Sequence, residues 1–198
     1  ENGYLAVPRF QRPLVWSDEQ RLELFRSVLD GIPIGAILQW RTSIQLETYP
    51  GLGPHRLQPA ASGDLIYYLL DGHQRLATLF GSLQPISQSP PGHLALIDSE
   101  GFATDKEWQM FFDLEEGRFR LGEKDRQPWW LPMDVVLDAR RMRRFQRELE
   151  RTILTDDNER LQEKIERYNS RADEVSIAFS QYPLPVLPFL NDDLDEAI

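Results

Sequence analysis

Cysteine is absent from all 198 residues of the chain. Disulfide bonds, thiolate metal sites and cysteine nucleophiles are therefore excluded, and a reducing cytoplasm is the simplest setting for the protein. No apolar run approaches the roughly 18 residues that a membrane-spanning helix requires. We therefore expect no contact with a membrane.

Positive charge is also scarce. Lysine and arginine number 22 against 32 aspartates and glutamates, which gives a formal net charge of −10. Non-specific DNA binding relies on neutralising phosphates with basic side chains, so bulk DNA repels a chain of this charge. Any DNA contact must come from a local basic patch or from another domain. The Walker A pattern of P-loop NTPases is missing as well, so any nucleotide hydrolysis would not follow the P-loop plan.

The composition is otherwise that of a globular protein, with 41% hydrophobic and 27% charged residues. A chain of this length has room for one domain with its own core and a helical extension. The mixture of strand and helix patterns predicts an α/β (α+β) fold. We place the core at residues 1–127, the helical extension at 128–181, and a return strand with the start of a truncated helix of the same domain at 182–198.

The most informative stretch runs from Leu65 to Gly81. Its first six residues are apolar or aromatic, which is typical of a buried strand. Asp71 follows and can cap a helix, Gly72 permits a tight turn, and Gly81 predicts the end of the helix. Apolar residues recur between them at helical spacing: Leu76, Leu79 and Phe80. The stretch therefore predicts a strand, a sharp turn and a short helix.

The turn carries four polar side chains, those of Asp71, His73, Gln74 and Arg75. Free amides at a helix N-terminus favour anions, and the planar guanidinium of Arg75 suits phosphate. A capped helix with a solvent-facing arginine explains the same residues equally well on chemistry alone.

Three blocks of the chain, in the right order, resemble the DUF262 family. The segment 69–79, LLDGHQRLATL, is similar to that family's Asp-Gly-Gln-Gln-Arg signature. The segment 7–17, VPRFQRPLVWS, is similar to its opening pattern of apolar-Pro-x-aromatic-Gln-Arg-x-x-x-Trp, and 32–40, IPIGAILQW, resembles the segment that usually follows. The chain departs from the pattern at His73, where the family has glutamine.

The DUF262 family forms the N-terminal part of GmrSD-type, modification-dependent restriction systems. The resemblance implies a ParB-like nucleotide-binding domain, here with an appended helical hairpin. It also implies a nucleoside triphosphate partner with Mg²⁺, and DNA reached only indirectly, through a nuclease domain or a partner subunit. In the family, the late strand leads into a Phe-Arg-Asn-Gly segment that this chain lacks, so we expect a site that is not complete.

The resemblance also assigns roles to residues. Asp71 would hold the magnesium ion or orient water, and His73, Gln74 and Arg75 would join it as catalytic residues. Nucleotide-binding residues would be Gln11, Arg12, Gly72 and Arg75. Gln11 and Arg12 lie between two prolines, which predicts an extended loop. The alternative for this loop is a simple surface arm.

Several other segments have clear patterns. Ser17 and Gln20 form a capping box, which predicts a helix after Ser17. A strand is predicted at 34–40, a long connection at 42–63 that includes His55 as a loop residue, a short strand at 93–97, and a β-hairpin at 108–121 with its glycine at the turn. The acidic residues Asp105, Asp113 and Glu115 near this hairpin are expected to be solvated, not metal-binding.

Two helices are predicted after residue 132, the second from about 156 to 173, and an edge strand at 182–190. Four arginines of the first helix fall at i, i+3, i+4 and i+7 and so share one face: Arg140, Arg143, Arg144 and Arg147. That face is either a solvated surface partly neutralised by Glu148 and Glu150, or a contact for DNA or for an acidic partner surface.

Three functions are compatible with these observations. The first is a Mg²⁺-dependent, GTPase- or ATPase-like sensor module of a modification-dependent restriction or phage-defence system. The second is a switch that binds a nucleotide without hydrolysing it, or a DNA-binding module. The third is a nuclease in its own right, which we rank last because the chain has no histidine-rich nuclease signature and no acidic cluster at two-metal spacing.

Overall fold

The computed structural model describes residues 4–61, 63–85, 108–122, 124–154 and 159–189. The first half contains β1 (Tyr4–Pro8), α1 (Asp18–Leu29), β2 (Ile37–Thr42), β3 (Thr48–Tyr49), β4 (Gly51–Leu52), β5 (His55–Arg56), β6 (Ile66–Asp71) and α2 (His73–Leu83). The second half contains β7 (Met110–Asp113), β8 (Arg118–Leu121), β9 (Trp130–Pro132), the 3-10 turn η2 (Met133–Val135), α4 (Ala139–Ile153), α5 (Glu159–Gln181) and β10 (Val186–Phe189).

A five-stranded mixed sheet forms the base of the molecule, with strand order β10-β2-β6-β1-β3. β1 and β6 are parallel, β2 and β6 antiparallel, and β10 is parallel to β2 at the edge. Trp40 and Tyr68 are fully buried in this sheet, and the Tyr68 hydroxyl donates to the Ile44 carbonyl oxygen at 3.0 Å. The α/β class and the edge position of the last strand are confirmed; the ParB-like assignment stays a prediction.

A second, three-stranded sheet has the order β8-β7-β9 and packs with α1, α4 and α5 around the largest apolar core. Phe25 of α1 meets Phe119 of β8 and Phe179 of α5 at ring-centroid distances of 5.5 and 5.2 Å. The predicted hairpin is confirmed, with Gly117 at φ 68° in its turn. The strand β9 is absent from the sequence prediction because its three residues are too few to show alternation.

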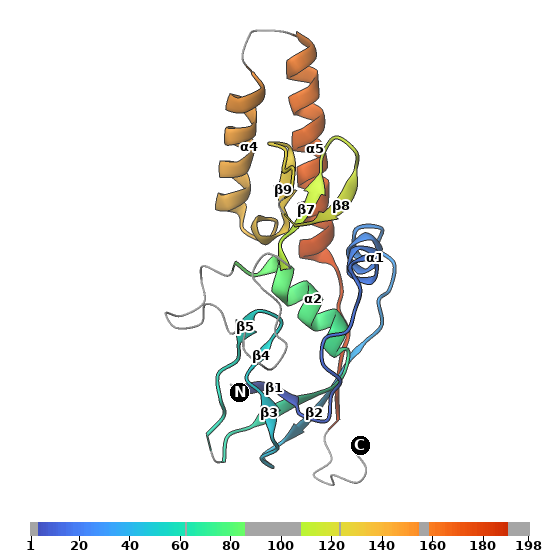
Figure 1. Cartoon of the computed structure of the whole chain (residues 1–198), viewed down its shortest axis with the longest axis vertical. Helices are drawn as coiled ribbons and strands as arrows, with labels where there is room; N and C mark the ends of the chain where they lie inside the picture. The colour runs from blue at the N-terminus through green and yellow to red at the C-terminus, as the bar shows by residue number, and fades with distance from the viewer. Residues whose placement is uncertain (1–3, 62, 86–107, 123, 155–158, 190–198) are drawn as a thin grey trace.

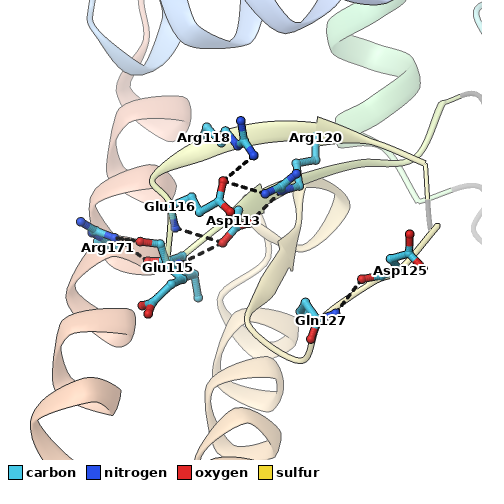
Figure 2. Close-up of polar contacts among 9 residues, drawn as sticks. Asp113, Glu115, Glu116, Arg118, Arg120, Asp125, Gln127 and Arg171 are labelled. Carbon is cyan, nitrogen blue, oxygen red and sulfur yellow. Dashed lines mark hydrogen bonds and ion pairs between the residues drawn. The ribbon is translucent and has the colours of Figure 1, made fainter.

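Asp113 lies at the centre of a polar network that joins the hairpin to its own turn (Figure 2). Its carboxylate is 2% exposed and accepts from Arg120 Nε at 2.8 Å and from the backbone amides of Glu115 and Glu116 at 3.0 and 3.1 Å. Burial acts to raise the pKa of Asp113, but these hydrogen bonds outweigh it and the pKa is lowered. The expectation of a solvated carboxylate at position 113 is therefore wrong.

The tertiary structure changes four further expectations. Gly72, not Asp71, is the N-cap of α2, and no side chain caps this helix. Gly81 does not end α2, which continues to Leu83; an added Cβ at Gly81 would lie 2.3 Å from Trp108 Cε3, so the glycine allows close packing. The connection 42–63 contains β3, β4 and β5, and His55 is buried with its ring 4.8 Å from that of Phe80.

The helical hairpin is confirmed, and it projects away from the five-stranded sheet on the far side of α2 (Figure 1). Its second helix extends to Gln181, beyond the predicted end at residue 173, because buried residues continue at helical spacing as far as Phe179.

The boundary at residues 127 and 128 stays a prediction, although β9 after it pairs with β7 before it. The predicted strand at 93–97, the helix after residue 190 and Asp105 lie outside the described residues.

Candidate functional site

The turn between β6 and α2 is built around Gly72. Its φ of 89° lies in the left-handed region, and a Cβ there would lie 2.4 Å from Ile37 Cδ1. Ile37 is itself buried in β2, so the side chain has little room to withdraw. The position therefore requires glycine for its conformation and for space. Because no side chain caps α2, the first amides of the helix are not engaged by a cap and are oriented to meet an anion.

The loop that carries Gln11 and Arg12 is fastened to this turn by four hydrogen bonds. Gln11 Nε2 donates to the Leu70 carbonyl oxygen at 2.7 Å, and the Arg12 carbonyl oxygen lies 3.1 Å from His73 Nδ1. Gln74 Nε2 donates to the Pro13 carbonyl oxygen at 2.8 Å, and its Oε1 accepts from the backbone amide of residue 15 at 2.9 Å. The side chains of Gln11, His73 and Gln74 thus hold the loop against the start of α2, while the Arg12 residue stays exposed.

Arg75 connects the turn to a third segment of the chain. Its Nη1 donates to the Ile34 carbonyl oxygen at 2.7 Å, and its Nη2 contacts Asp71 Oδ2 at 2.9 Å. The Arg75 side chain is only 17% exposed, whereas the Asp71 side chain is 71% exposed. A Cβ at Gly35 would lie 2.5 Å from Arg75 Nη1, so this glycine makes room for the guanidinium. All three segments that resemble the DUF262 blocks therefore meet at Arg75 and the turn.

The hydrogen bond between His73 and the Arg12 carbonyl oxygen is one that glutamine could also make. A carbonyl oxygen can only accept, so the proton in the contact with Arg12 lies on Nδ1. Burial lowers the pKa of His73, and the hydrogen bond to Arg12 only partly opposes this shift. The ring is therefore mainly neutral at pH 7, and a glutamine amide would supply the same donor.

The first prediction concerns His73→Gln. A histidine whose pKa is lowered on folding binds protons more readily when unfolded, so its contribution to stability is complete above the unfolded value of about 6.5 and is lost as pH falls. We expect wild-type protein to lose more thermal stability than His73→Gln between pH 7.5 and 5.5, with similar stability at the upper end. Melting curves across this range measure the difference, and identical pH profiles would contradict the assigned role.

A cavity of about 420 Å³ opens beside Arg75. Its walls come mainly from the face of α1 that carries Glu19 and Glu23, together with Trp16, Ser27 and Ile34. The capping box at Ser17 predicts α1 as a helix but does not indicate that this helix forms a wall of the cavity. The available signal is the spacing of Glu19 and Glu23, four residues apart and hence on one side of a helix directly after the opening block.

Nearly the whole chain matches a known protein family. A family model described as the GmrSD restriction endonuclease, N-terminal domain, matches residues 1–196. The chain belongs to this family. A search of curated proteins found no match. The protein is therefore a module of a restriction or phage-defence system, and its family implies a partner nuclease domain.

Within this GmrSD N-terminal domain, no group of three or more histidine, aspartate and glutamate side chains is arranged to hold a metal ion among the described residues. Asp71 is a single exposed carboxylate at the turn. Mg²⁺ is commonly bound through one or two carboxylates together with substrate phosphates and water. Asp71 therefore fits a Mg²⁺ ion that is bound mainly by the phosphates of a nucleotide. One carboxylate is too few for a metal centre that the described residues would hold by themselves.

The remaining predicted contact residues of the GmrSD domain lie elsewhere. Arg140, Arg143, Arg144 and Arg147 are all exposed on α4, in the projecting hairpin, and not beside the turn. The described helices include none that is long and apolar enough to cross a membrane.

Proposed function

We propose that the β6–α2 turn of this restriction-system module binds a nucleoside triphosphate and, with Mg²⁺, hydrolyses it. The observation that carries the proposal is Arg75, which lines the 420 Å³ cavity and pairs with Asp71 at the uncapped start of α2. A cation, an exposed carboxylate and backbone amides at one helix N-terminus are the groups that phosphate and its metal ion require.

The charges of the site determine the orientation in which the nucleotide binds. Glu19 and Glu23 repel phosphates, so the polyphosphate lies at Arg75 and the amides that follow Gly72. The nucleoside occupies the cavity, where the Trp16 ring offers a surface for stacking. The two glutamates accept hydrogen bonds from ribose hydroxyls or from base N–H groups. Arg12 is exposed on the loop that is bound to the start of α2. It therefore lies at the end of the site that takes the phosphates.

Hydrolysis depends on positioning and charge neutralisation in this proposal. The nucleotide brings Mg²⁺, which neutralises charge on the phosphates, and Asp71 anchors it with its exposed carboxylate. Arg75 leaves its pairing with Asp71 to bind a phosphate oxygen, and its hydrogen bond to Ile34 keeps the guanidinium in place. Gln11, His73 and Gln74 act by positioning the loop that bears Arg12.

The alternative is a switch that binds the nucleotide without turnover. It is favoured by one observation, that the His73 and Gln74 side chains are engaged with backbone groups of the loop and not directed at a water molecule. Phosphate release from each of the four NTPs with Mg²⁺ separates the two functions. Release above the no-protein control supports the hydrolase, and binding without release supports the switch.

The second prediction is that Asp71→Asn folds normally and does not hydrolyse nucleotide. Among the described residues, Asp71 caps no helix and forms one ion pair, in which its own carboxylate is largely exposed; such a pair contributes about 0–1 kcal/mol. Loss of its charge instead removes the anchor for Mg²⁺. We expect unchanged melting temperature within a few degrees and loss of Mg²⁺-dependent phosphate release. Wild-type turnover in Asp71→Asn would assign Asp71 a purely structural role.

A matched control for this measurement is Asp64→Asn, which removes one carboxylate from another loop of the same half of the chain. Asp64 accepts from the Ala61 amide at 2.6 Å, a bond that an asparagine oxygen can also accept. The control carries the same change in net charge as Asp71→Asn. Turnover at the wild-type rate is expected for Asp64→Asn, so a loss confined to Asp71→Asn is specific to the turn.

A further inference from the structure

The helix α4 carries a second charged feature that the nucleotide site does not use. Its arginines at 140, 143, 144, 147 and 151, which we call the arginine stripe, are spaced i, i+3, i+4, i+7 and i+11 and are all exposed. The buried residues Met142 and Leu149 lie on the opposite side of the same helix, since each residue advances by about 100°. The stripe therefore faces directly away from the core.

The arginine stripe is little compensated within the described part of the chain: Asp138 lies near Arg140 at the start of α4, and Glu148 and Glu150 belong to the same helix. None of its five guanidinium groups forms an ion pair or hydrogen bond there, whereas the sixth arginine of α4, Arg141, is paired with Asp134 at 2.5 Å. α4 holds six arginines and two glutamates in a chain whose net charge is −10. Positive charge is thus concentrated on one exposed helix face while the rest of the molecule is acidic.

We propose that the arginine stripe binds the phosphate backbone of duplex DNA. All five residues are arginine, whose planar fork pairs with phosphate oxygens through two hydrogen bonds. The stripe extends about 16 Å along the helix, at about 1.5 Å per residue. Each strand of duplex DNA carries one negative charge per about 3.4 Å of the helix axis, which is close to the spacing of about one arginine per 3–4 Å along the stripe.

The stripe lacks the features of a protein–protein interface. The core of such an interface combines arginine with aromatic and other apolar anchors and is depleted of other charged residues. Within α4, no large apolar side chain is exposed; Leu137 and Leu154 flank its two ends. The acidic remainder of the protein is repelled by DNA, which orients the molecule with the projecting hairpin toward the duplex (Figure 1). The contact is independent of sequence because phosphates carry no base information.

The third prediction tests this contact with fluorescence anisotropy of a labelled 20-base-pair duplex, titrated with the whole chain at several salt concentrations without nucleotide. We expect binding at low salt that weakens steeply as salt rises, since each neutralised phosphate contributes about −0.9 to the slope of log K against log salt. Arg143→Gln/Arg144→Gln/Arg147→Gln should weaken low-salt binding at least tenfold and reduce the magnitude of the slope by about 2 to 3.

The matched control is Arg26→Gln/Arg56→Gln/Arg118→Gln, which changes net charge equally at three exposed positions outside α4. It should bind DNA within about twofold of wild type, and both variants should keep the wild-type circular dichroism spectrum. An equal loss in the control, or wild-type affinity in the stripe variant, would overturn the proposal. Polyglutamate that competes as effectively as unlabelled duplex at equal charge would also overturn it, because the partner would then be an acidic protein surface.

Discussion

Arg75→Ala is expected to weaken nucleoside triphosphate binding by tenfold or more. A hydrogen bond to a charged group contributes about 1.5–3 kcal/mol, and about 1.4 kcal/mol corresponds to a factor of ten in affinity. Arg75 also joins two of the three family-like segments, because it bonds to the Ile34 carbonyl and pairs with Asp71. Isothermal titration with each of the four NTPs and Mg²⁺ measures the loss directly.

The nucleotide titration of Arg75→Ala must be accompanied by a measurement of the stability of this variant. The guanidinium is largely buried and donates to the Ile34 carbonyl, so some stability is lost with it. Urea unfolding reports that loss, and titrations are made under conditions where the variant is fully folded. Arg26→Ala, on the exposed side of α1, is the matched control and should bind nucleotide like wild type. Unchanged affinity in folded Arg75→Ala would remove the nucleotide site from the turn.

Gly72→Ala is expected to destabilise the protein by about 2–5 kcal/mol. A non-glycine residue at φ 89° costs about 1–2 kcal/mol, and the overpacked Cβ against Ile37 Cδ1 adds about 1–3 kcal/mol. The new methyl group also lies 3.4 Å from Arg75 Nη2, so nucleotide binding should weaken as well. Urea unfolding of wild type and variant measures the free-energy difference.

The chain offers a close control for Gly72. Gly63 has nearly the same φ, 87°, but no atom lies within 4 Å of its added Cβ. Gly63→Ala therefore reports the backbone cost alone, and the excess for Gly72→Ala is the steric cost. Ile37→Val removes the clashing Cδ1, so the double variant Gly72→Ala/Ile37→Val should be less destabilised than the sum of the two single changes. Equal losses at Gly63 and Gly72 would contradict the close contact with Ile37.

Local patterns in the sequence were sufficient for the elements that carry the site. The apolar run before Asp71 predicted β6, the helical spacing after it predicted α2, and the capping box at Ser17 is present, with the Gln20 amide 3.4 Å from Ser17 Oγ. These features depend on interactions within a few residues. The three family-like segments likewise belong to parts of the chain that lie together at the β6–α2 turn.

The structure also explains why local signals failed elsewhere. Gly81 has the features of a helix stop, but Trp108 packs against it and α2 continues. Asp113 has the features of a solvated turn residue, but Arg120 and two amides compensate its burial. In both cases the outcome depends on tertiary packing: on Trp108 beside Gly81, and on the burial of Asp113. Neither can be read from the local sequence.

The sequence alone determined the α/β class, the strand–turn–helix at residue 72 and the amphipathic face of α4, because each follows from periodicity or from a backbone conformation that few residues adopt. Only the tertiary structure decided what the polar side chains of the turn do. Gln11, His73 and Gln74 bond to groups 59 to 61 residues away in the chain. Partners at such separation are brought together by packing of the whole fold, which leaves Arg75, paired with Asp71, beside the cavity.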